Sequence, residues 1–232
     1  MRSASGNNSH YLLRLAELLA TAPLKALAHF GMTLAACAVS SAAVQAADVS
    51  PELGRSAHQL AETTCVNCHG ASGRSISPMF PNLAAQTAPY LEAQLHAFRD
   101  QTRADPDALS YMWGMASQLD DATIEAISTY YAAQTPPRAK TGDAKLTARG
   151  KQIFEEGVTS QGVPACATCH GPQARGDNIF PRLAGQHADY LVKQALVIQR
   201  GLRAAPVMHG VIKDLSQDQM RAVATYLESL SP

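Results

Sequence analysis

Several residue types are scarce in this chain of 232 residues, and each scarcity excludes a class of protein. Charged residues make up only 16%, and 19 lysines and arginines are balanced by 19 aspartates and glutamates. The chain therefore has no basic field that would hold a nucleic-acid backbone, and we expect no nucleic-acid partner. Aromatic residues make up 6%, β-branched runs are few and Ala is abundant, which favours helices over sheets. The hydrophobic content of 46% is that of a globular protein rather than a disordered one.

The first 46 residues have the pattern of a secretory signal peptide. Three basic residues precede an apolar stretch from about residue 30 to 44, and small residues flank the cleavage sequence Val44-Gln45-Ala46. We therefore predict that residues 1–46 are a signal peptide and that the mature chain begins at Ala47. An uncleaved membrane anchor is the alternative, but the apolar stretch is shorter than the span of about 20 residues that a bilayer requires.

Cysteine occurs five times, and an odd number cannot all pair in disulfides. Cys37 lies in the leader, where Leu34-Ala35-Ala36-Cys37 resembles the lipobox of bacterial lipoproteins. We favour a small apolar residue that leaves with the leader over a lipid anchor at Cys37. The reasons are that the cleavage sequence at Ala46 is well formed and that His29 interrupts the stretch before Cys37. The other four cysteines fall into two closely spaced pairs.

The chain after residue 46 repeats itself. Three segments recur in the same order: residues 65–70 as 166–171, residues 80–86 as 180–186, and residues 112–130 as 208–226. The offset between the copies falls from 101 to 100 to 96, as expected when loops lose residues between duplicated domains. The prolines and polar residues of 134–143 are typical of an exposed linker. We therefore predict two domains, at residues 47–138 and 139–232.

The pattern within each copy is helical. Met220, Val223 and Leu227 share one helix face, and Ser216 with Gln219 forms a capping box at its start. Asp120 offers the matching N-cap in the first copy. Further helices are expected at about residues 51–63, 89–99, 148–154 and 188–199. The expected fold class is all-α, and because domains of about 93 residues have little core of their own, we expect a cofactor to complete it.

Each pair of cysteines is followed directly by a histidine. Two thiols three residues apart on the first turn of a helix reach the two vinyl groups of a haem, and the next residue places an imidazole under the iron. A thioredoxin-like disulfide and a pooled zinc site are alternatives, but neither accounts for a histidine after both pairs or for their separation into two domains. We therefore predict two covalently bound haem c groups, attached at Cys65, Cys68 and His69 and at Cys166, Cys169 and His170.

The iron of each haem needs two axial ligands. His69 and His170 are the expected fifth ligands, and a Met thioether is the usual sixth ligand of a c-type haem with a raised potential. Met112 and Met208 are the candidates, because each lies seven residues before a leucine that also recurs in both copies.

Two alternatives to these methionines stay open. Met115 competes in the first domain, but its counterpart in the second copy is a valine, so the repeat favours Met112. In the second domain His209 would give bis-His ligation and a lower potential. We interpret Met79 and Met220 as packing residues.

Together these motifs resemble the cytochrome c4 family, periplasmic dihaem cytochromes built from two class I cytochrome c domains. The resemblance covers residues 48–232 and rests on both Cys-x-x-Cys-His motifs, both Phe-Pro-x-Leu-Ala-x-Gln runs and both Tyr-Leu-x-x-Gln segments. It implies a periplasmic single-electron carrier, not an enzyme, acting between a quinol-oxidising complex and a terminal oxidase, and it leaves peripheral association with the membrane open. One alternative is the haem subunit of a periplasmic dehydrogenase complex. Another is a dihaem peroxidase, but the short length of the chain and the candidate Met in each domain argue against a peroxidase.

The resemblance also implies roles for residues around each haem. The carbonyl groups of Pro81 and Pro181 would accept the second N–H of the proximal imidazole. Gly54 and Gly150 would let the first helix of each domain cross the last one closely, against Tyr130 and Tyr226. Four polar residues are expected along the haem edge: Gln86, Gln186, Arg103 and Arg203.

Overall fold

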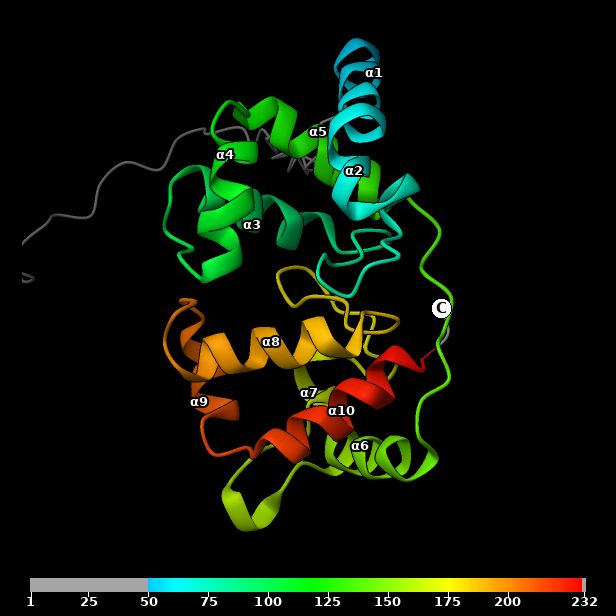
Figure 1. Cartoon of the computed structure of the whole chain (residues 1–232), viewed down its shortest axis with the longest axis vertical. Coiled ribbons are helices and arrows are strands. Elements are labelled where there is room, and N and C mark those ends of the chain that lie inside the picture. Colours follow the sequence, from blue (N-terminus) through cyan, green and yellow to red (C-terminus); the bar gives the residue numbers. More distant parts are fainter. Residues whose placement is uncertain (1–49, 231–232) are drawn as a thin grey trace, which may run out of the picture. The chain divides into compact units, whose positions relative to one another are not determined.

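The computed structural model describes residues 50–230, so the predicted signal peptide and Cys37 lie outside the described residues. Within this range the chain forms helices joined by loops, with two isolated β-bridges and no strand, as the all-α prediction requires (Figure 1). None of these helices is both long and apolar enough for a transmembrane span.

The first domain contains α1 (Pro51–Leu60), the π-helical turn η1 (Ala61–Cys65), α2 (Val66–His69), the short turn η2 (Ala71–Gly73), α3 (Ala88–Arg99), the π-helical turn η3 (Ala108–Met112), α4 (Trp113–Ala116) and α5 (Asp121–Ala132). The second contains α6 (Ala144–Glu156), the short turn η4 (Thr159–Gln161), α7 (Ala167–His170), α8 (Ala188–Gln199), α9 (Pro206–Ile212) and α10 (Gln217–Glu228).

The last helix of each domain begins where its cap predicts. Asp120 accepts a hydrogen bond from the backbone N–H of Thr123 at 2.8 Å, which starts α5. Ser216 and Gln219 form both halves of the predicted capping box at the start of α10. Since these bonds satisfy backbone donors that have no partner inside the helix, the sequence determines both helix starts locally.

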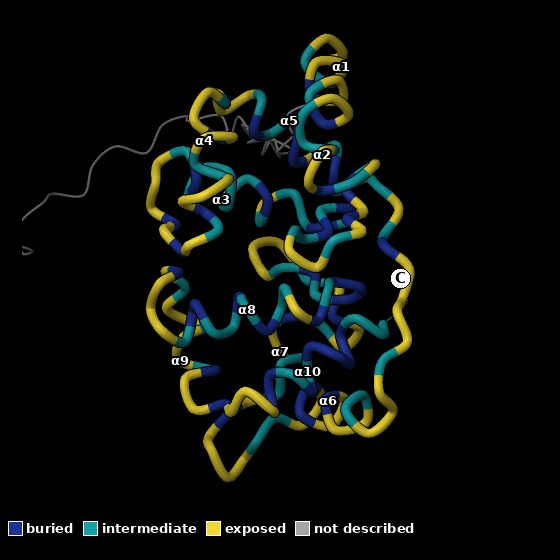
Figure 2. The backbone as a smooth tube through the Cα atoms, in the orientation of Figure 1, coloured by how far each residue is buried: buried dark blue, intermediate teal, exposed yellow. Residues whose placement is uncertain are grey.

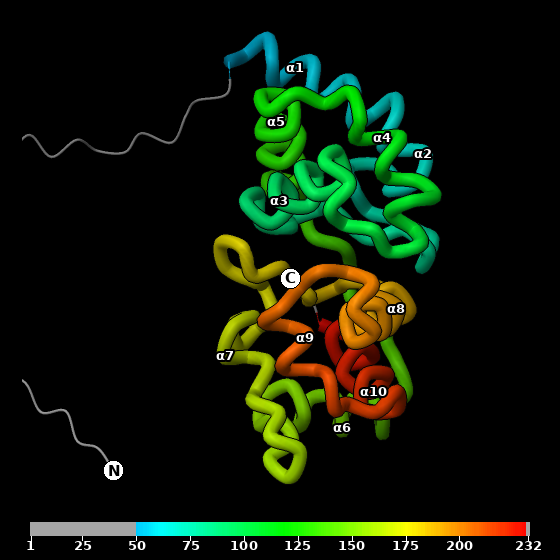
Figure 3. The backbone as a smooth tube through the Cα atoms, turned by 90° about the vertical axis from the view of Figure 1, so that its left-hand side faces the viewer, coloured from blue at the N-terminus to red at the C-terminus, as the bar shows by residue number. Residues whose placement is uncertain are grey.

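In the second domain the first and last helices cross closely at Gly150. Helices α6 and α10 lie next to each other in both views of the backbone (Figures 1 and 3). A Cβ added to Gly150 would lie 2.0 Å from the carbonyl oxygen of Ala222 and 2.9 Å from the Cβ of Tyr226. The predicted close crossing against Tyr226 is therefore confirmed, and Figure 2 shows buried positions along α10 where it meets its neighbours.

The same prediction for Gly54 is wrong. No atom lies within 4 Å of a Cβ built on Gly54, and Ala57 of α1 and Ala61 of η1 pack on α5 instead. Tyr130 contacts α1 and η1 further along, with its hydroxyl donating to the carboxylate of Glu62 at 2.6 Å. The offset between the copies is 96 at this glycine but 101 at the motif, so the second domain has five more residues between them. Those residues form the loop after α6, whereas α1, η1 and α2 follow one another directly in the first domain.

A turn with left-handed backbone recurs in both domains after the Leu-Ala pair. The residue with positive φ in this turn is Ala85 in the first domain, with φ of 56°, and Gly185 in the second, with φ of 76°. The backbone N–H of Ala85 donates to the carbonyl of Tyr131, and that of Gly185 donates to the carbonyl of Leu227. The turn thus anchors the loop after each motif to the last helix, and Ala85 holds a backbone conformation that glycine adopts without strain.

Candidate haem sites

Each motif lies on one short helical turn, so its thiols and its histidine are brought together as predicted. In the first domain Cys65 ends η1 and is followed directly by α2, whereas in the second Cys166 is the N-cap of α7. The thiols of both pairs are free, so the structure holds no disulfide within either motif. Across residues 50–230 no three His, Cys, Asp or Glu side chains are grouped as a metal site would require, so the cysteines are not pooled as in a zinc site.

The two motif histidines are buried and oriented in the same way. His69 is 7% exposed and its Nδ1 lies 2.9 Å from the carbonyl oxygen of Pro81, while His170 is 4% exposed and its Nδ1 lies 3.0 Å from that of Pro181. The hydrogen bonds expected at both prolines are therefore confirmed. A carbonyl can only accept, so Nδ1 carries the proton and Nε2 keeps its lone pair for a metal. Burial also lowers the pKa of both imidazoles, which favours the neutral form that binds iron.

The surroundings of the histidines suit a flat apolar cofactor. The ring of Phe80 stands edge-on to His69 with ring centroids 6.2 Å apart, and Phe180 stands in the same way to His170 at 6.4 Å. Burial raises the pKa of the Cys65 thiol, as it does for Cys166, while the second thiol of each pair is exposed. The residues of both sites thus fit a covalently attached haem, with thiols free to bond and an imidazole fixed in orientation.

The candidate methionines occupy equivalent places in the two domains. Met112 ends η3 and packs on a cluster that contains Phe98, and Met208 lies in α9 and packs on a cluster that contains Ile198. Both thioethers are half-buried, whereas Met115 is 48% exposed. These methionines come from segments separate from the motifs, so each site would draw its two candidate ligands from different helices.

The residues that follow the candidate methionines are also equivalent. The indole N–H of Trp113 donates to the carbonyl of Arg103 at 2.8 Å, and Nδ1 of His209 lies 2.9 Å from the carbonyl of Ile198. These side chains thereby hold the methionine segment to the loop after α3 in the first domain and to the end of α8 in the second. Met220 is buried in the core as predicted, but Met79 is 50% exposed, so its interpretation as a packing residue is wrong.

A contact between the two domains is the feature that the sequence alone did not reveal. The side-chain amide of Gln86 binds both the backbone N–H and the carbonyl of Arg182, at 2.6 and 2.9 Å. Gln186 binds the backbone of Asn82 in the same way, at 2.9 Å for each bond. The buried amides of these glutamines join each domain to the proline-containing loop of the other, and their expected place along the haem edge stays a prediction. Their recurrence at offset 100 was the only sequence signal of this pseudo-symmetric contact.

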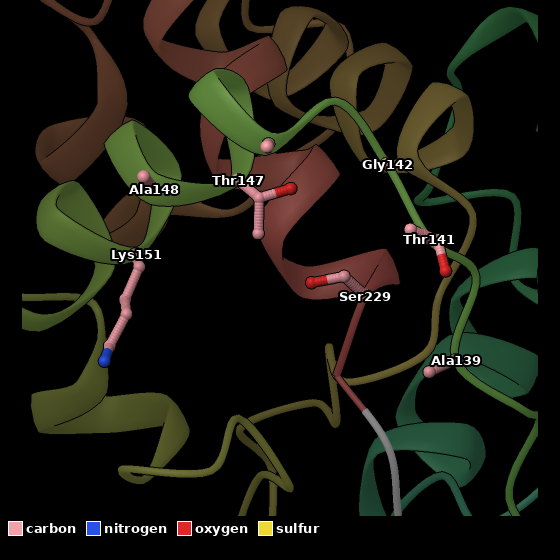
Figure 4. Close-up of a pocket in the computed structure, with 8 residues that line it drawn as sticks. Ala139, Thr141, Gly142, Thr147, Ala148, Lys151 and Ser229 are labelled. Atoms are coloured by element: carbon pink, nitrogen blue, oxygen red, sulfur yellow. The ribbon is translucent and has the colours of Figure 1, made fainter.

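A surface hollow lies elsewhere in the second domain. It lies between the linker and α6, with Thr141, Lys151 and Ser229 among its lining residues (Figure 4). Since no motif cysteine, histidine or candidate methionine lines it, it is not part of either haem site.

Two all-α domains, each with a Cys-x-x-Cys-His turn and a buried histidine held by a proline carbonyl, define a dihaem c-type cytochrome. The Cytochrome c family model matches residues 55–133 and 147–231. Cytochrome c-552 of Acidithiobacillus ferridurans is 40% identical over 203 residues, which cover 87% of this chain and 86% of that protein. The structure of Acidithiobacillus ferrooxidans cytochrome c4 is 42% identical, covers 72% of this chain and 98% of its own, and superposes with a TM-score of 0.68.

A third relative has a name that describes a partner. The thiosulfate dehydrogenase electron acceptor of Thiomonas intermedia is 36% identical over 180 residues, which cover 73% of this chain and 80% of that protein. Taken together, these similarities show that the chain belongs to the cytochrome c4 family of the cytochromes c. It carries two covalently bound haem c groups and is a dihaem electron carrier.

Proposed function

We propose that this protein is a periplasmic carrier of single electrons in a respiratory chain, taking them from a quinol-oxidising complex and delivering them to a terminal oxidase. The observation that carries the proposal is the duplication of one site with two candidate axial ligands. Each domain offers a buried, oriented imidazole and a half-buried thioether on a separate segment. An iron with both axial positions filled has no open position for a substrate, which suits electron transfer better than catalysis.

The proposed ligand sets are His69 with Met112 and His170 with Met208. Haem supplies the one-electron chemistry, and the chain supplies the ligands, their orientation and the apolar surroundings. The carbonyls of Pro81 and Pro181 keep each imidazole in one tautomer. The cleaved leader, residues 1–46, would deliver the chain to the periplasm, where haem c proteins of this family would meet membrane-bound partners.

The ligand proposal is tested with a matched pair of variants. Met112→Ala should abolish the spectroscopic signature of an iron–thioether bond in one haem and let carbon monoxide bind that haem when reduced. Met115→Ala, three residues away and 48% exposed, should leave both haems unchanged. The opposite pattern would assign the ligand to Met115, and a wild-type protein without thioether ligation in the second haem would favour His209.

The carrier role is tested by kinetics with membranes. Membranes that contain a terminal oxidase should oxidise the reduced holoprotein rapidly, and membranes supplied with quinol should reduce it again. Peroxide turnover together with carbon monoxide binding to one haem of the wild-type protein would instead indicate a dihaem peroxidase.

A second candidate is the haem partner of a periplasmic dehydrogenase. It is favoured by the similarity to a thiosulfate dehydrogenase electron acceptor over most of both chains. In that case, a thiosulfate-oxidising dehydrogenase should reduce the protein faster than quinol-supplied membranes do. A stable complex that survives purification would favour a permanent subunit over a diffusing carrier.

A further inference from the structure

The contact between the two domains is held by hydrogen bonds and ion pairs. Each hydrophobic cluster of the described residues lies within one domain. Besides the amides of Gln86 and Gln186, the guanidiniums of Arg103 and Arg203 cross the contact. Each donates to the side-chain oxygens of both Gln94 and Gln194, at 2.7 to 2.9 Å. Since residues 50–230 form no apolar core between the domains, single polar groups decide how firmly the domains stay together.

His187 bridges the two domains within this contact. Its Nε2 lies 3.0 Å from the backbone carbonyl oxygen of Ser75 in the first domain. Its Nδ1 lies 3.7 Å from a carboxylate oxygen of Glu228, near the end of α10 in the second domain. The side chains of His187 and Glu228 are only 15% and 14% exposed. Each nitrogen of the ring thus faces an oxygen that can only accept a hydrogen bond.

The protonated imidazole fits these surroundings better than the neutral one. A neutral ring has one N–H and one lone pair. Because the carbonyl of Ser75 must be given the N–H, the lone pair of Nδ1 then faces the carboxylate of Glu228. An imidazolium donates on both sides, and its charge-assisted hydrogen bonds are about twice as strong as neutral ones. Protonation therefore strengthens the bond across the domains.

Two nearby groups oppose or share this interaction. His187 is the N-cap of α8, and the positive end of the helix dipole opposes a second positive charge there. Lys140 of the linker lies 3.8 Å from the same oxygen of Glu228, but its side chain is 74% exposed, so solvent screens it. The nearly buried carboxylate of Glu228 is thus the group that compensates the imidazolium. The other charged residues next to these elements have partners of their own: Arg74 donates to the carbonyl of Thr135, and Arg221 pairs with Asp189.

The repeat supports a role for this position in joining the domains. Thr87 occupies the position of His187 in the first domain, at offset 100. Its hydroxyl also donates across the contact, to the backbone carbonyl of Asn178 at 2.6 Å. Both copies therefore place a donor to the other domain here, and in the second copy that donor is a group that titrates.

The remaining groups of the contact carry charges that do not ordinarily change near neutral pH. Histidine is the side chain whose unperturbed charge change falls between pH 5 and 8. Asp105 accepts a hydrogen bond from Arg103 at 2.8 Å, and Asp107 pairs with Lys193 across the domains. The other histidines of the described chain make their contacts within their own domains: His58, His69, His96, His170 and His209.

Tyr90 is a second titratable group of the contact, and it would act in the opposite direction. Its hydroxyl accepts a hydrogen bond from Arg203 at 2.8 Å. Burial raises the pKa of Tyr90, but the guanidiniums of Arg203 and Arg103 outweigh burial, and the net shift is downward. Loss of its proton would place a negative charge beside these guanidiniums and strengthen the contact as the pH rises.

We propose that His187 is a pH-sensitive link between the domains, which tightens their contact as the pH falls through the ordinary titration range of histidine. Stabilisation by the imidazolium is present at the acidic end of this range and is lost as the pH rises. Ser75 lies in the loop that leads to Pro81, and its hydroxyl donates to the carbonyl of Cys68 at 3.3 Å. The link therefore acts on the loop that surrounds the first Cys-x-x-Cys-His motif.

Amide hydrogen exchange of the reduced holoprotein tests this inference by nuclear magnetic resonance. The backbone N–H groups of Asn82 and Arg182 donate to the side chains of Gln186 and Gln86 across the contact, so separation of the domains releases them. Their protection factors, from which the intrinsic pH dependence of exchange is divided out, should rise about threefold to fivefold from pH 8 to pH 5.5. The N–H groups of Ala85 and Gly185 serve as internal controls and should not change, because they bond to the last helix of their own domain.

Four variants assign the effect to its group. His187→Thr copies the first domain and keeps a donor that does not titrate, so it should abolish the pH dependence. Glu228→Gln removes the compensating charge and should abolish most of it. His96→Gln removes a histidine that pairs with Asp121 inside the first domain, and it should behave like wild type, as should Tyr90→Phe.

Three outcomes would overturn the inference. The first is equal protection of Asn82 and Arg182 at both pH values in wild type, and the second is a pH dependence that survives in His187→Thr. The third is its loss in Tyr90→Phe, which would assign the titration to the phenol. Glu228→Gln decides the question should His187→Thr fail to fold, because a full pH dependence in that variant would equally exclude the link.

Discussion

The same substitution at two repeat-equivalent glycines should have opposite effects on stability. Gly54 and Gly150 both lie inside the first helix of their domain, and the repeat aligns them. In a helix interior, alanine is more stable than glycine by about 1 kcal/mol. Gly54→Ala should therefore stabilise the protein by up to about 1 kcal/mol, because its new Cβ meets nothing within 4 Å.

Gly150→Ala should destabilise the protein in spite of the same gain in helix propensity. Its Cβ would lie 2.0 Å from the carbonyl oxygen of Ala222, and ordinary contact begins at 3.4 Å, so the helices must separate by about 1.4 Å. The clash is with backbone, and no rotamer change relieves it. Overpacking of this kind costs about 1–3 kcal/mol. After the propensity gain of about 1 kcal/mol is subtracted, we expect a net loss of up to about 2 kcal/mol.

Denaturant unfolding of the oxidised holoprotein measures both effects. Far-ultraviolet circular dichroism reports the helices and haem absorption reports the two sites, so that separate unfolding of the domains would be detected. The denaturation midpoints of wild type, Gly54→Ala and Gly150→Ala are compared, provided that all three show the same dependence of the free energy of unfolding on denaturant concentration. A midpoint for Gly150→Ala at or above that of wild type, or equal losses in both variants, would refute the packing argument.

Three further substitutions test other local features. Ala85→Gly should raise the free energy of unfolding by up to about 1 kcal/mol, because relief of left-handed strain exceeds the entropy cost of glycine; a lower thermal midpoint would contradict this. Tyr131→Phe removes a buried hydroxyl that has no hydrogen bond of ordinary geometry, at a place where the second domain has Leu227, so stability in denaturant should be unchanged or higher by about 1 kcal/mol. A clear loss would show that the hydroxyl is bonded. Ser216→Ala removes one half of the capping box and should cost about 1 kcal/mol in the unfolding of the second domain; an unchanged unfolding midpoint would contradict this.

Local chemistry explains most of what could be predicted. The helices from Asp120 and Ser216 begin at their caps, because a cap bonds backbone groups only two or three residues away. The thiols and imidazole of each motif come together because one helical turn spans them. The family resemblance predicted that the carbonyls of Pro81 and Pro181 accept a hydrogen bond from the proximal histidines, and the structure confirms both bonds.

Features that depend on distant parts of the chain were missed or wrong. The role predicted for Gly54 is wrong because the approach of the first and last helices depends on the length of the segment between the first helix and the Cys-x-x-Cys-His motif. This segment is five residues longer in the second domain than in the first. The domain contact made by the amides of Gln86 and Gln186 was missed, since a sequence does not say which surface of one domain meets the other.

By itself the sequence determined the class of fold, the number of haems and the residues that attach them, because these follow from short spacings and from a repeat that can be read directly. Only the tertiary structure decided how the copies differ. It pairs Arg103 with Asp105, leaves Arg203 and Arg182 without a carboxylate, and buries all of these residues near the contact of the domains. The effect of a charge depends on its burial and on its partners, and both are set by chain segments that lie far apart in the sequence.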